Sequence, residues 1–230
     1  MRKTDPMGRG VLPERVEGPR LVLRRWTPAD LERLAELVQR NLAHLRPWMP
    51  WVATEPLPGT RRLELLHLWE HQWRDGGDVL MAIVLDETLV GGTGLHHRPE
   101  PDGLEIGYWV DKDHLRRGIA TETAAMLTSA ALSLPDISAV QIHHDKANTR
   151  SAMVPRRLGY RFLGESPDRA EAPGEVGIDC AWEMPAHAWL TSPAPSLGRS
   201  NDPGRPGPAP VAQGRLPPPP RSRTGGHRPH

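Results

Sequence analysis

Residues 105–122 read Glu-Ile-Gly-Tyr-Trp-Val-Asp-Lys-Asp-His-Leu-Arg-Arg-Gly-Ile-Ala-Thr-Glu. A strand pattern ends at Val110, a short loop follows, and a long helical pattern begins. The first turn of a helix has unpaired N–H groups and a partial positive charge, so it can bind an anion. Arg116 and Arg117 add charge, while Gly118 and Ala120 leave room for a phosphate near the backbone. An ordinary strand-to-helix turn with a basic rim is the alternative, because neither GxxxxGK[ST] nor GxGxxG is present.

The rest of the chain predicts a mixed α/β domain around this segment. Its elements follow the order β-α-α-β-β-β-α-β-α-β-β. We expect strands at 16–26, 79–85, 89–97, 103–110, 139–143, 160–164 and 177–184. We expect helices that start at 27–30 and that span 59–74, 116–134 and 148–158.

Composition divides the 230 residues into three parts. Residues 191–230 hold 11 Pro and 6 Gly without a hydrophobic period, which predicts a disordered tail. A flexible leader at 1–15 and one domain at 16–190 account for the rest. The six Arg and one Asp of the tail give it +5, so the total of +1 leaves −4 on residues 1–190. An acidic body argues against a nucleic-acid partner.

Three further features predict a cytoplasmic protein without a membrane partner. No run approaches the roughly 18 apolar residues that a membrane span needs. The first residues lack the apolar stretch of a signal peptide. The single cysteine, Cys180, cannot form an internal disulfide, and we expect it to be a small buried residue in the last strands.

A second segment, residues 148–160, carries little information when taken alone. Asn148 is a suitable N-cap, and Ser151 lies three residues later, where a hydroxyl is ordinary. Together with residues 105–110 and 116–122, however, Asn148-Thr149-Arg150-Ser151 and Leu158-Gly159-Tyr160 resemble the GCN5-related N-acetyltransferase (GNAT) superfamily. The Leu45-Arg46-Pro47-Trp48 loop makes the ribosomal-protein N-terminal acetyltransferase branch the closer match. The resemblance covers residues 16–190.

The resemblance implies a mostly antiparallel sheet with flanking helices and a notch between two splayed strands for acetyl-CoA. Acetyl-CoA would be the donor, and no metal is implied. The loop would bind the CoA pyrophosphate, and the strand backbone and Asn148 would bind pantetheine. The implied CoA-binding residues are Trp109, Val110, Arg116, Arg117, Gly118, Ile119, Ala120, Thr121 and Asn148. One departure is Leu115, which removes a polar donor because the family has Gln or Arg there.

The reaction needs a neutral amine that attacks a thioester. An α-amino group, with a pKa of about 7.7–8.0, is partly neutral at pH 7, whereas a lysine at about 10.4 hardly is. Glu105, on the strand that leads into the implied notch, is the candidate base through a water, although it could be a solvated strand residue. Ser151 is the candidate proton donor for the leaving thiolate, with a plain helix-start hydroxyl as the alternative.

The acceptor is the least determined part of the hypothesis. Trp48 and Trp51, in a loop between prolines, are candidates for a wall of the acceptor site, with a cover over the core as the alternative. The branch favours a protein N-terminal amine. A small-molecule amine, such as a polyamine or an aminoglycoside, and a non-catalytic CoA-binding protein are the alternatives. The sequence also leaves a homodimer open.

Two other patterns suggest different chemistry. Residues 67–71 match the H-x-x-E-H motif of some zinc proteases, but five residues match easily by chance in a chain with 11 His. The pairs His96-His97 and His143-His144 should place one ring on each face of a sheet. The four prolines at 217–220 could bind an aromatic groove or could simply solubilise the tail.

Overall fold

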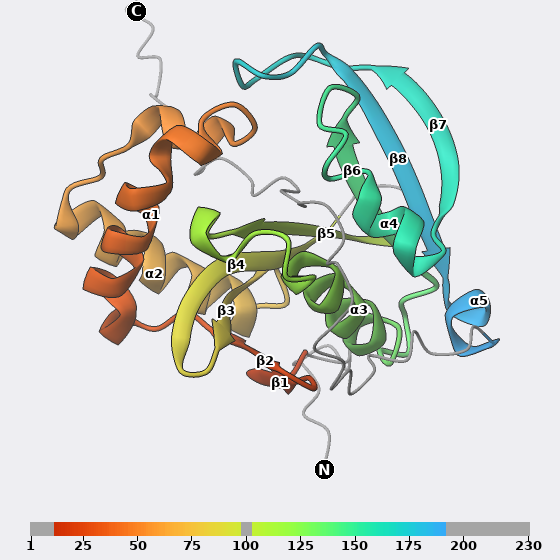
Figure 1. The fold of residues 1–230 in the computed structure, drawn as a ribbon. Helices are drawn as coiled ribbons and strands as arrows, with labels where there is room; N and C mark the ends of the chain where they lie inside the picture. The colour runs from red at the N-terminus through yellow and green to blue at the C-terminus, as the bar shows by residue number, and fades with distance from the viewer. Residues whose placement is uncertain (1–11, 98–102, 192–230) are drawn as a thin grey trace, which may run out of the picture.

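The computed structural model describes residues 12–97 and 103–191, and in this part of the chain it shows one sheet with helices on both faces (Figure 1). The strand order is β1-β2-β3-β4-β5-β6-β8-β7, and only β5 and β6 pair in parallel. The strands are β1 (Arg15–Glu17), β2 (Leu21–Arg25), β3 (Val79–Leu85), β4 (Thr88–His97), β5 (Gly103–Val110), β6 (Ala139–Asp145), β7 (Arg161–Pro167) and β8 (Ile178–Pro185). This mostly antiparallel arrangement confirms the predicted fold class.

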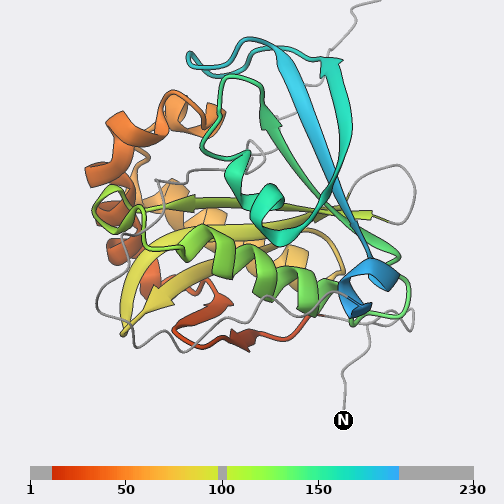
Figure 2. The same ribbon diagram turned by 45° about the vertical axis from the view of Figure 1, so that its right-hand side comes forward.

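Helices cover the two faces of the sheet separately (Figure 2). Helices α1 (Leu31–Leu45) and α2 (Gly59–Arg74) pack on one face, and α3 (Ile119–Ala131) and α4 (Met153–Leu158) pack on the other. Side chains alternate along β5, so Tyr108 joins the core under α3 while Trp109 joins the core under α1 and α2. The remaining elements are η1 (Pro28–Asp30), η2 (Pro50–Thr54), η3 (Lys112–His114) and α5 (Ala186–Thr191).

The parallel strands β5 and β6 form a fork. They pair at only three positions, which are Gly103 with Ala139, Leu104 with Val140 and Glu105 with Gln141. Beyond these positions β5 remains paired with β4, and β6 remains paired with β8. The sheet therefore opens between the two strands, and Figure 1 shows β6 and β8 rising away from β5. This opening is the notch that the resemblance implies.

Two helices begin later than their sequence patterns predict. The predicted helix at 116–134 spans 119–131, because Arg116 (φ 64°) and Gly118 (φ 73°) have left-handed backbone that a right-handed helix cannot contain. The predicted helix at 148–158 spans 153–158. Asn148 Oδ1 accepts a hydrogen bond from the Ser151 N–H (3.2 Å), so Asn148 caps a turn that precedes the helix.

The N-terminal strand and the domain ends also differ from the predictions. The strand predicted at 16–26 is divided into β1 and β2 by a turn in which the Gly18 N–H donates to the Leu21 carbonyl (2.8 Å). Leu12, in the predicted leader, is buried in the core under α3, and α5 was not predicted. Residues 1–11 of the leader and the tail from residue 192 lie outside the described residues. None of the described helices is long and apolar enough to cross a membrane.

Candidate active site

The loop before α3 has the geometry of an anion site. Gly118 is the N-cap residue of α3, and its left-handed backbone (φ 73°) turns the chain into the helix without a capping side chain. Arg116 and Arg117 are exposed beside it, and Ile119 and Ala120 are buried. The first N–H groups of the helix therefore lie beside a basic surface that is accessible to solvent.

Thr121 adds an observation that points to a ligand. Its hydroxyl oxygen is buried in the first turn of α3, and it has no hydrogen-bond partner among the described residues. A buried polar atom without a partner is uncommon in proteins and calls for a missing partner. A phosphate oxygen at this helix N-terminus would supply one.

Glu122 ties this first turn to the start of β2. Its buried carboxylate accepts hydrogen bonds from the backbone N–H of Arg20 (3.0 Å) and of Leu21 (3.3 Å). The Arg20 guanidinium pairs with the same carboxylate (2.7 Å) and donates to the Arg117 carbonyl (3.1 Å). Arg20 is therefore a supporting residue that the sequence analysis missed, since it lies 97 residues before Arg117.

Leu115 has a packing role at the position where the family pattern has a polar side chain. Its side chain is half-buried and packs against the core under α3, so it contributes to packing where a polar donor would stand. Side-chain charge at the loop then comes from Arg116 and Arg117.

Ser151 and Tyr108 lie together next to the fork. Ser151 is fully buried, and its Oγ lies 3.1 Å from the Tyr108 hydroxyl. Burial raises the pKa of Tyr108 far above its ordinary value, more than the hydrogen bond to Ser151 lowers it, so the phenol stays protonated. Tyr108 therefore keeps a proton that it can share with Ser151. In the sequence Tyr108 belongs only to a motif, and its partner Ser151 lies 43 residues further along the chain.

His44, at the end of α1, is a second residue that the sequence analysis missed. Its ring makes a hydrogen bond with the backbone of Val110, where β5 ends. Burial lowers the pKa of His44, and the positive charge of Arg150 lowers it further. The ring is therefore neutral near pH 7, and it fixes the open end of β5 without adding charge.

Glu105 occupies the last paired position of the fork. It is fully buried, so the prediction of a solvated strand residue is excluded. Its direct neighbours in the sheet are His96 on β4 and Gln141 on β6. Alternation along β5 places the Glu105 side chain on the same face as Trp109, the face that α1 and α2 cover.

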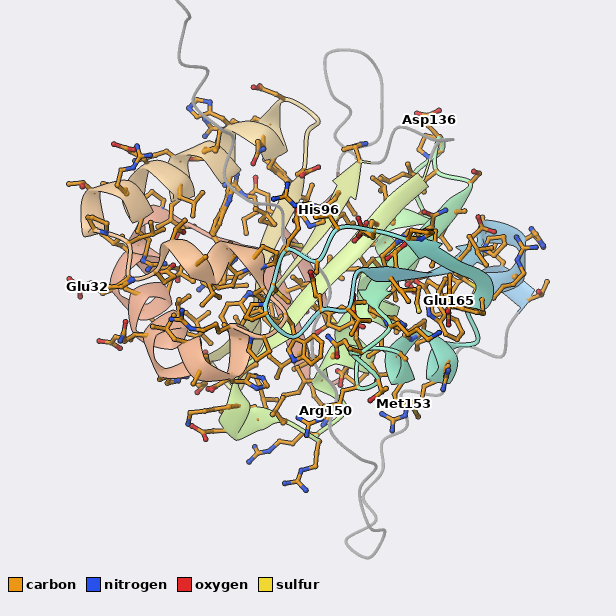
Figure 3. All side chains as sticks on the ribbon, turned by 90° about the horizontal axis from the view of Figure 1, so that it is seen from above. Glu32, His96, Asp136, Arg150, Met153 and Glu165 are labelled. Atoms are coloured by element: carbon orange, nitrogen blue, oxygen red, sulfur yellow. The ribbon has the colours of Figure 1, made fainter. Side chains whose placement is uncertain are left out.

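Polar side chains continue on both sides of Glu105. On one side, His96 Nδ1 lies 2.9 Å from an oxygen of Asp78. On the other side, Gln141 Oε1 lies 3.1 Å from His143 Nε2, and His143 Nδ1 lies 2.7 Å from Asp179. We call these six side chains the polar row: Asp78, His96, Glu105, Gln141, His143 and Asp179. Figure 3 shows His96 near the middle of the view and Glu32 at the outer edge of the molecule. As predicted, His97 is exposed while His96 is buried.

A cavity of about 290 Å³ lies between the sheet and the α1–α2 region. Its walls are mostly apolar, and Trp51 and Trp109 contribute neighbouring rings whose centroids are 6.2 Å apart. Glu55 also lines it, but a buried ion pair with Arg62 (2.7 Å) neutralises the carboxylate. Trp48 is half-buried and does not line the cavity, so the structure separates the two tryptophans that the sequence paired.

The geometry does not support a zinc site at the H-x-x-E-H motif or a nucleophilic role for Cys180. His67 and His71 of the H-x-x-E-H motif are exposed on α2, and Glu70 pairs with Arg74 (2.7 Å). In residues 12–97 and 103–191, no group of three or more His, Cys, Asp or Glu could hold a metal ion. Cys180 is buried, as predicted, and burial raises the pKa of its thiol above the ordinary value. It is therefore a poor nucleophile.

Comparisons with known proteins define the class. The model of the acetyltransferase (GNAT) domain family matches residues 20–161, and the chain belongs to this family. It is an N-acetyltransferase that uses acetyl-CoA as its donor. The protein of Bacillus subtilis (strain 168) described as "Putative ribosomal N-acetyltransferase YdaF" is 29% identical over 149 residues, which are 64% of this chain and 81% of that protein.

Solved structures agree on the fold. The crystal structure of a "Probable acetyltransferase" superposes with a TM-score of 0.70 at 26% identity, over 76% of this chain and 98% of that chain. RimL, a ribosomal L7/L12 α-N-protein acetyltransferase solved with coenzyme A, superposes with a TM-score of 0.69 at 20% identity. The superposition covers 76% of this chain and 99% of the RimL chain. The RimL likeness supports the fold.

Proposed function

We propose that this enzyme acetylates the N-terminal amine of a protein, which it binds on the α1–α2 face of the sheet. The observation that carries the proposal is the position of Glu105, which is buried at the fork on the same face as the cavity beside Trp109. A base at this point can meet an amine that arrives from the cavity side. The names of YdaF and RimL both refer to ribosomal acetylation, which supports a protein acceptor.

The character of the cavity supports a peptide over a polyamine. Its walls are mostly apolar, and Arg62 neutralises the buried Glu55 carboxylate. A polyamine needs several unpaired carboxylates, because each of its ammonium groups must keep a polar partner when it is buried. An N-terminal peptide brings one amine and small side chains, which suit an apolar wall.

The donor is assigned to the opposite face and the fork. The N–H groups of residues 118–121, the Thr121 hydroxyl and the charges of Arg116 and Arg117 would hold the pyrophosphate of CoA. The open backbone at Trp109 and Val110 and the side chain of Asn148 would hold its pantetheine arm. When bound, acetyl-CoA supplies an activated acetyl thioester.

The protein side chains then handle two protons. Glu105 accepts one from the ammonium form of the acceptor, directly or through one water, which leaves a neutral amine. Ser151 donates one to the leaving sulfur, and Tyr108, 3.1 Å away, can replace it. The second amine proton then returns to this pair. The proposal includes a cytoplasmic location, since a single buried cysteine suits a reducing compartment.

The test is an acceptor panel with the full chain. Peptides that begin with Ser, Ala or Met are offered with acetyl-CoA, together with spermidine, an aminoglycoside and one peptide whose N-terminus is blocked but which contains lysine. Mass spectrometry locates the acetyl group, and thiol release gives the rate. Acetylation at a peptide α-amine supports the proposal. Turnover confined to spermidine or the aminoglycoside would contradict it, and acetyl-CoA binding without turnover on any amine would indicate a CoA-binding protein.

A further inference from the structure

The polar row contains two Asp–His pairs that flank Glu105 and differ in one respect. Both ring nitrogens of His143 are engaged, Nδ1 with Asp179 and Nε2 with Gln141. His96 uses only Nδ1, which faces Asp78. Its Nε2 is buried and has no hydrogen-bond partner among the described residues.

The tautomer of His96 follows from its partner. Burial by itself would raise the pKa of Asp78, but the hydrogen bonds from the His96 ring and from the His97 N–H help to lower that pKa overall. Asp78 is therefore a carboxylate, which can only accept hydrogen bonds. Nδ1 must then carry a hydrogen, so Nε2 is the proton acceptor when the ring is neutral.

The position of Nε2 suits a role beside Glu105. His96 and Glu105 are directly opposed on β4 and β5, and opposed side chains in antiparallel strands have Cβ atoms roughly 4.5–5.5 Å apart on one face. The ring extends along β4 over Gly94, because a Cβ on Gly94 would lie only 3.1 Å from Nε2. Gly94 is opposed by Gly107, so neither strand places a side chain there, and Leu80 packs over Gly94, since a Cβ on Gly94 would lie 2.7 Å from its Cδ2.

We propose that His96 is a positioning residue for Glu105 that also relays its proton. The step rests on the proposed function. Glu105 takes one proton from the ammonium group of the acceptor and passes it to Nε2 of His96. The imidazolium is stabilised by the Asp78 carboxylate. When the products leave, Nε2 gives the proton to water in the open fork, and the ring is again neutral with its hydrogen on Nδ1. Glu105 is thereby a carboxylate again before the next turnover.

Few charged groups surround His96 in the described part of the chain. Asp78 approaches from the loop before β3, and Glu105 approaches from β5. On α2, which packs against β3, Glu70 pairs with Arg74 (2.7 Å) and with Arg25 of β2 (4.0 Å). His97 is exposed on the other face of β4. In this setting the Asp78 carboxylate orients the His96 ring, and Glu105 is the group from which the ring can take a proton.

The test compares His96→Asn with His97→Asn. Asn at position 96 keeps an N–H close to the place of Nδ1, so Asp78 retains its donor, while Nε2 is removed. With a peptide acceptor, we expect kcat of His96→Asn to fall about 100-fold at pH 6.5, with KM for acetyl-CoA within twofold of the unmodified chain. At pH 9.5 the amine is already neutral, so the loss should shrink to below tenfold. His97→Asn should match the unmodified chain at both pH values.

A defect in packing alone would not depend on the protonation state of the acceptor. An equal loss at both pH values, or a kcat within threefold of the unmodified chain at pH 6.5, would overturn the relay. If His96→Asn does not fold, Asp78→Asn is measured in the same way, and it should show a smaller loss with the same pH dependence. An unmodified chain without turnover on any amine would overturn the proposed function itself, which distinguishes the two failures.

Discussion

The loop before α3 and the cavity between the sheet and the α1–α2 region would serve the two substrates, and they are built differently. The loop consists of consecutive residues, and its geometry comes from left-handed backbone at Arg116 and Gly118. The cavity takes its walls from α1, η2, α2 and strands β3 to β5, whose residues are far apart in the chain. One substitution that disturbs the backbone of the loop should therefore abolish binding there. Single substitutions in the cavity walls should each weaken binding by a smaller amount.

Among the substitutions that test this comparison, Gly118→Glu should have the largest effect, which is a loss of acetyl-CoA affinity. A carboxylate and its bulk would occupy the anion site, and any side chain at φ 73° is strained. We expect at least a 100-fold loss of acetyl-CoA affinity by calorimetry. Gly159→Glu is the matched control, because Gly159 has φ 75°, has nothing within 4 Å of the position that a Cβ would take, and lies outside the proposed donor site. Unchanged acetyl-CoA binding by Gly118→Glu would refute the pyrophosphate assignment.

Glu105→Gln should have a different effect from Gly118→Glu, because it should reduce catalysis and leave acetyl-CoA binding intact. The amide keeps the shape of the buried side chain but cannot take a proton, so kcat should fall about 100-fold or more while acetyl-CoA affinity remains unchanged. Steady-state rates and calorimetry on the same preparation test this. Glu32→Gln, on the exposed start of α1, serves as the control (Figure 3). Full activity of Glu105→Gln across the pH range would remove Glu105 as the base.

Trp51→Leu should change only the acceptor side. It removes one of the two neighbouring rings in the cavity, so we expect KM for the peptide to rise about tenfold while KM for acetyl-CoA stays the same. Trp48→Leu provides the comparison, since Trp48 does not line the cavity, and it should leave KM for the peptide within threefold. If Trp48→Leu has the larger effect on the peptide, the cavity is not the acceptor site.

Asp145→Asn should affect stability more than activity. The carboxylate of Asp145 accepts hydrogen bonds from the backbone N–H groups of Val176 (3.0 Å) and Gly177 (2.9 Å), which hold the β7–β8 loop. Burial would raise the pKa of Asp145, but these hydrogen bonds and that of Ala147 lower it overall. We expect a loss of about 2 kcal/mol in the free energy of unfolding at pH 7, measured by denaturant titration.

The pH dependence of this contribution has a definite sign. Because the pKa of Asp145 is lower in the folded chain than in the unfolded chain, its contribution is complete above the unfolded value of 3.8 and disappears as pH falls through the folded value. Asp145→Asn should therefore lose less stability than the unmodified chain between pH 5 and pH 2. Asp136→Asn, at an exposed position, should behave like the unmodified chain (Figure 3).

Local features of the fold were predicted well because they depend on neighbouring residues. The start of the first helix at 27–30 was predicted from its capping residues, and the structure shows a capping box between Thr27 and Asp30. The helix boundaries at 116 and 148 were wrong, since the pattern of apolar residues does not reveal left-handed backbone at a non-glycine residue such as Arg116. The role of Leu115 in packing also needed the tertiary structure.

The sequence by itself determined the order of the main elements and the role of Asn148 as a cap, because each depends on residues close together in the chain. Only the tertiary structure decided what surrounds Glu105. Strand alternation tells which face a side chain occupies, but it does not tell which strands lie on either side. The neighbours His96 and Gln141 come from β4 and β6, and the separation of Trp51 from Trp48 depends on how η2 packs over the sheet. These contacts are formed by folding, and no pattern within one segment encodes them.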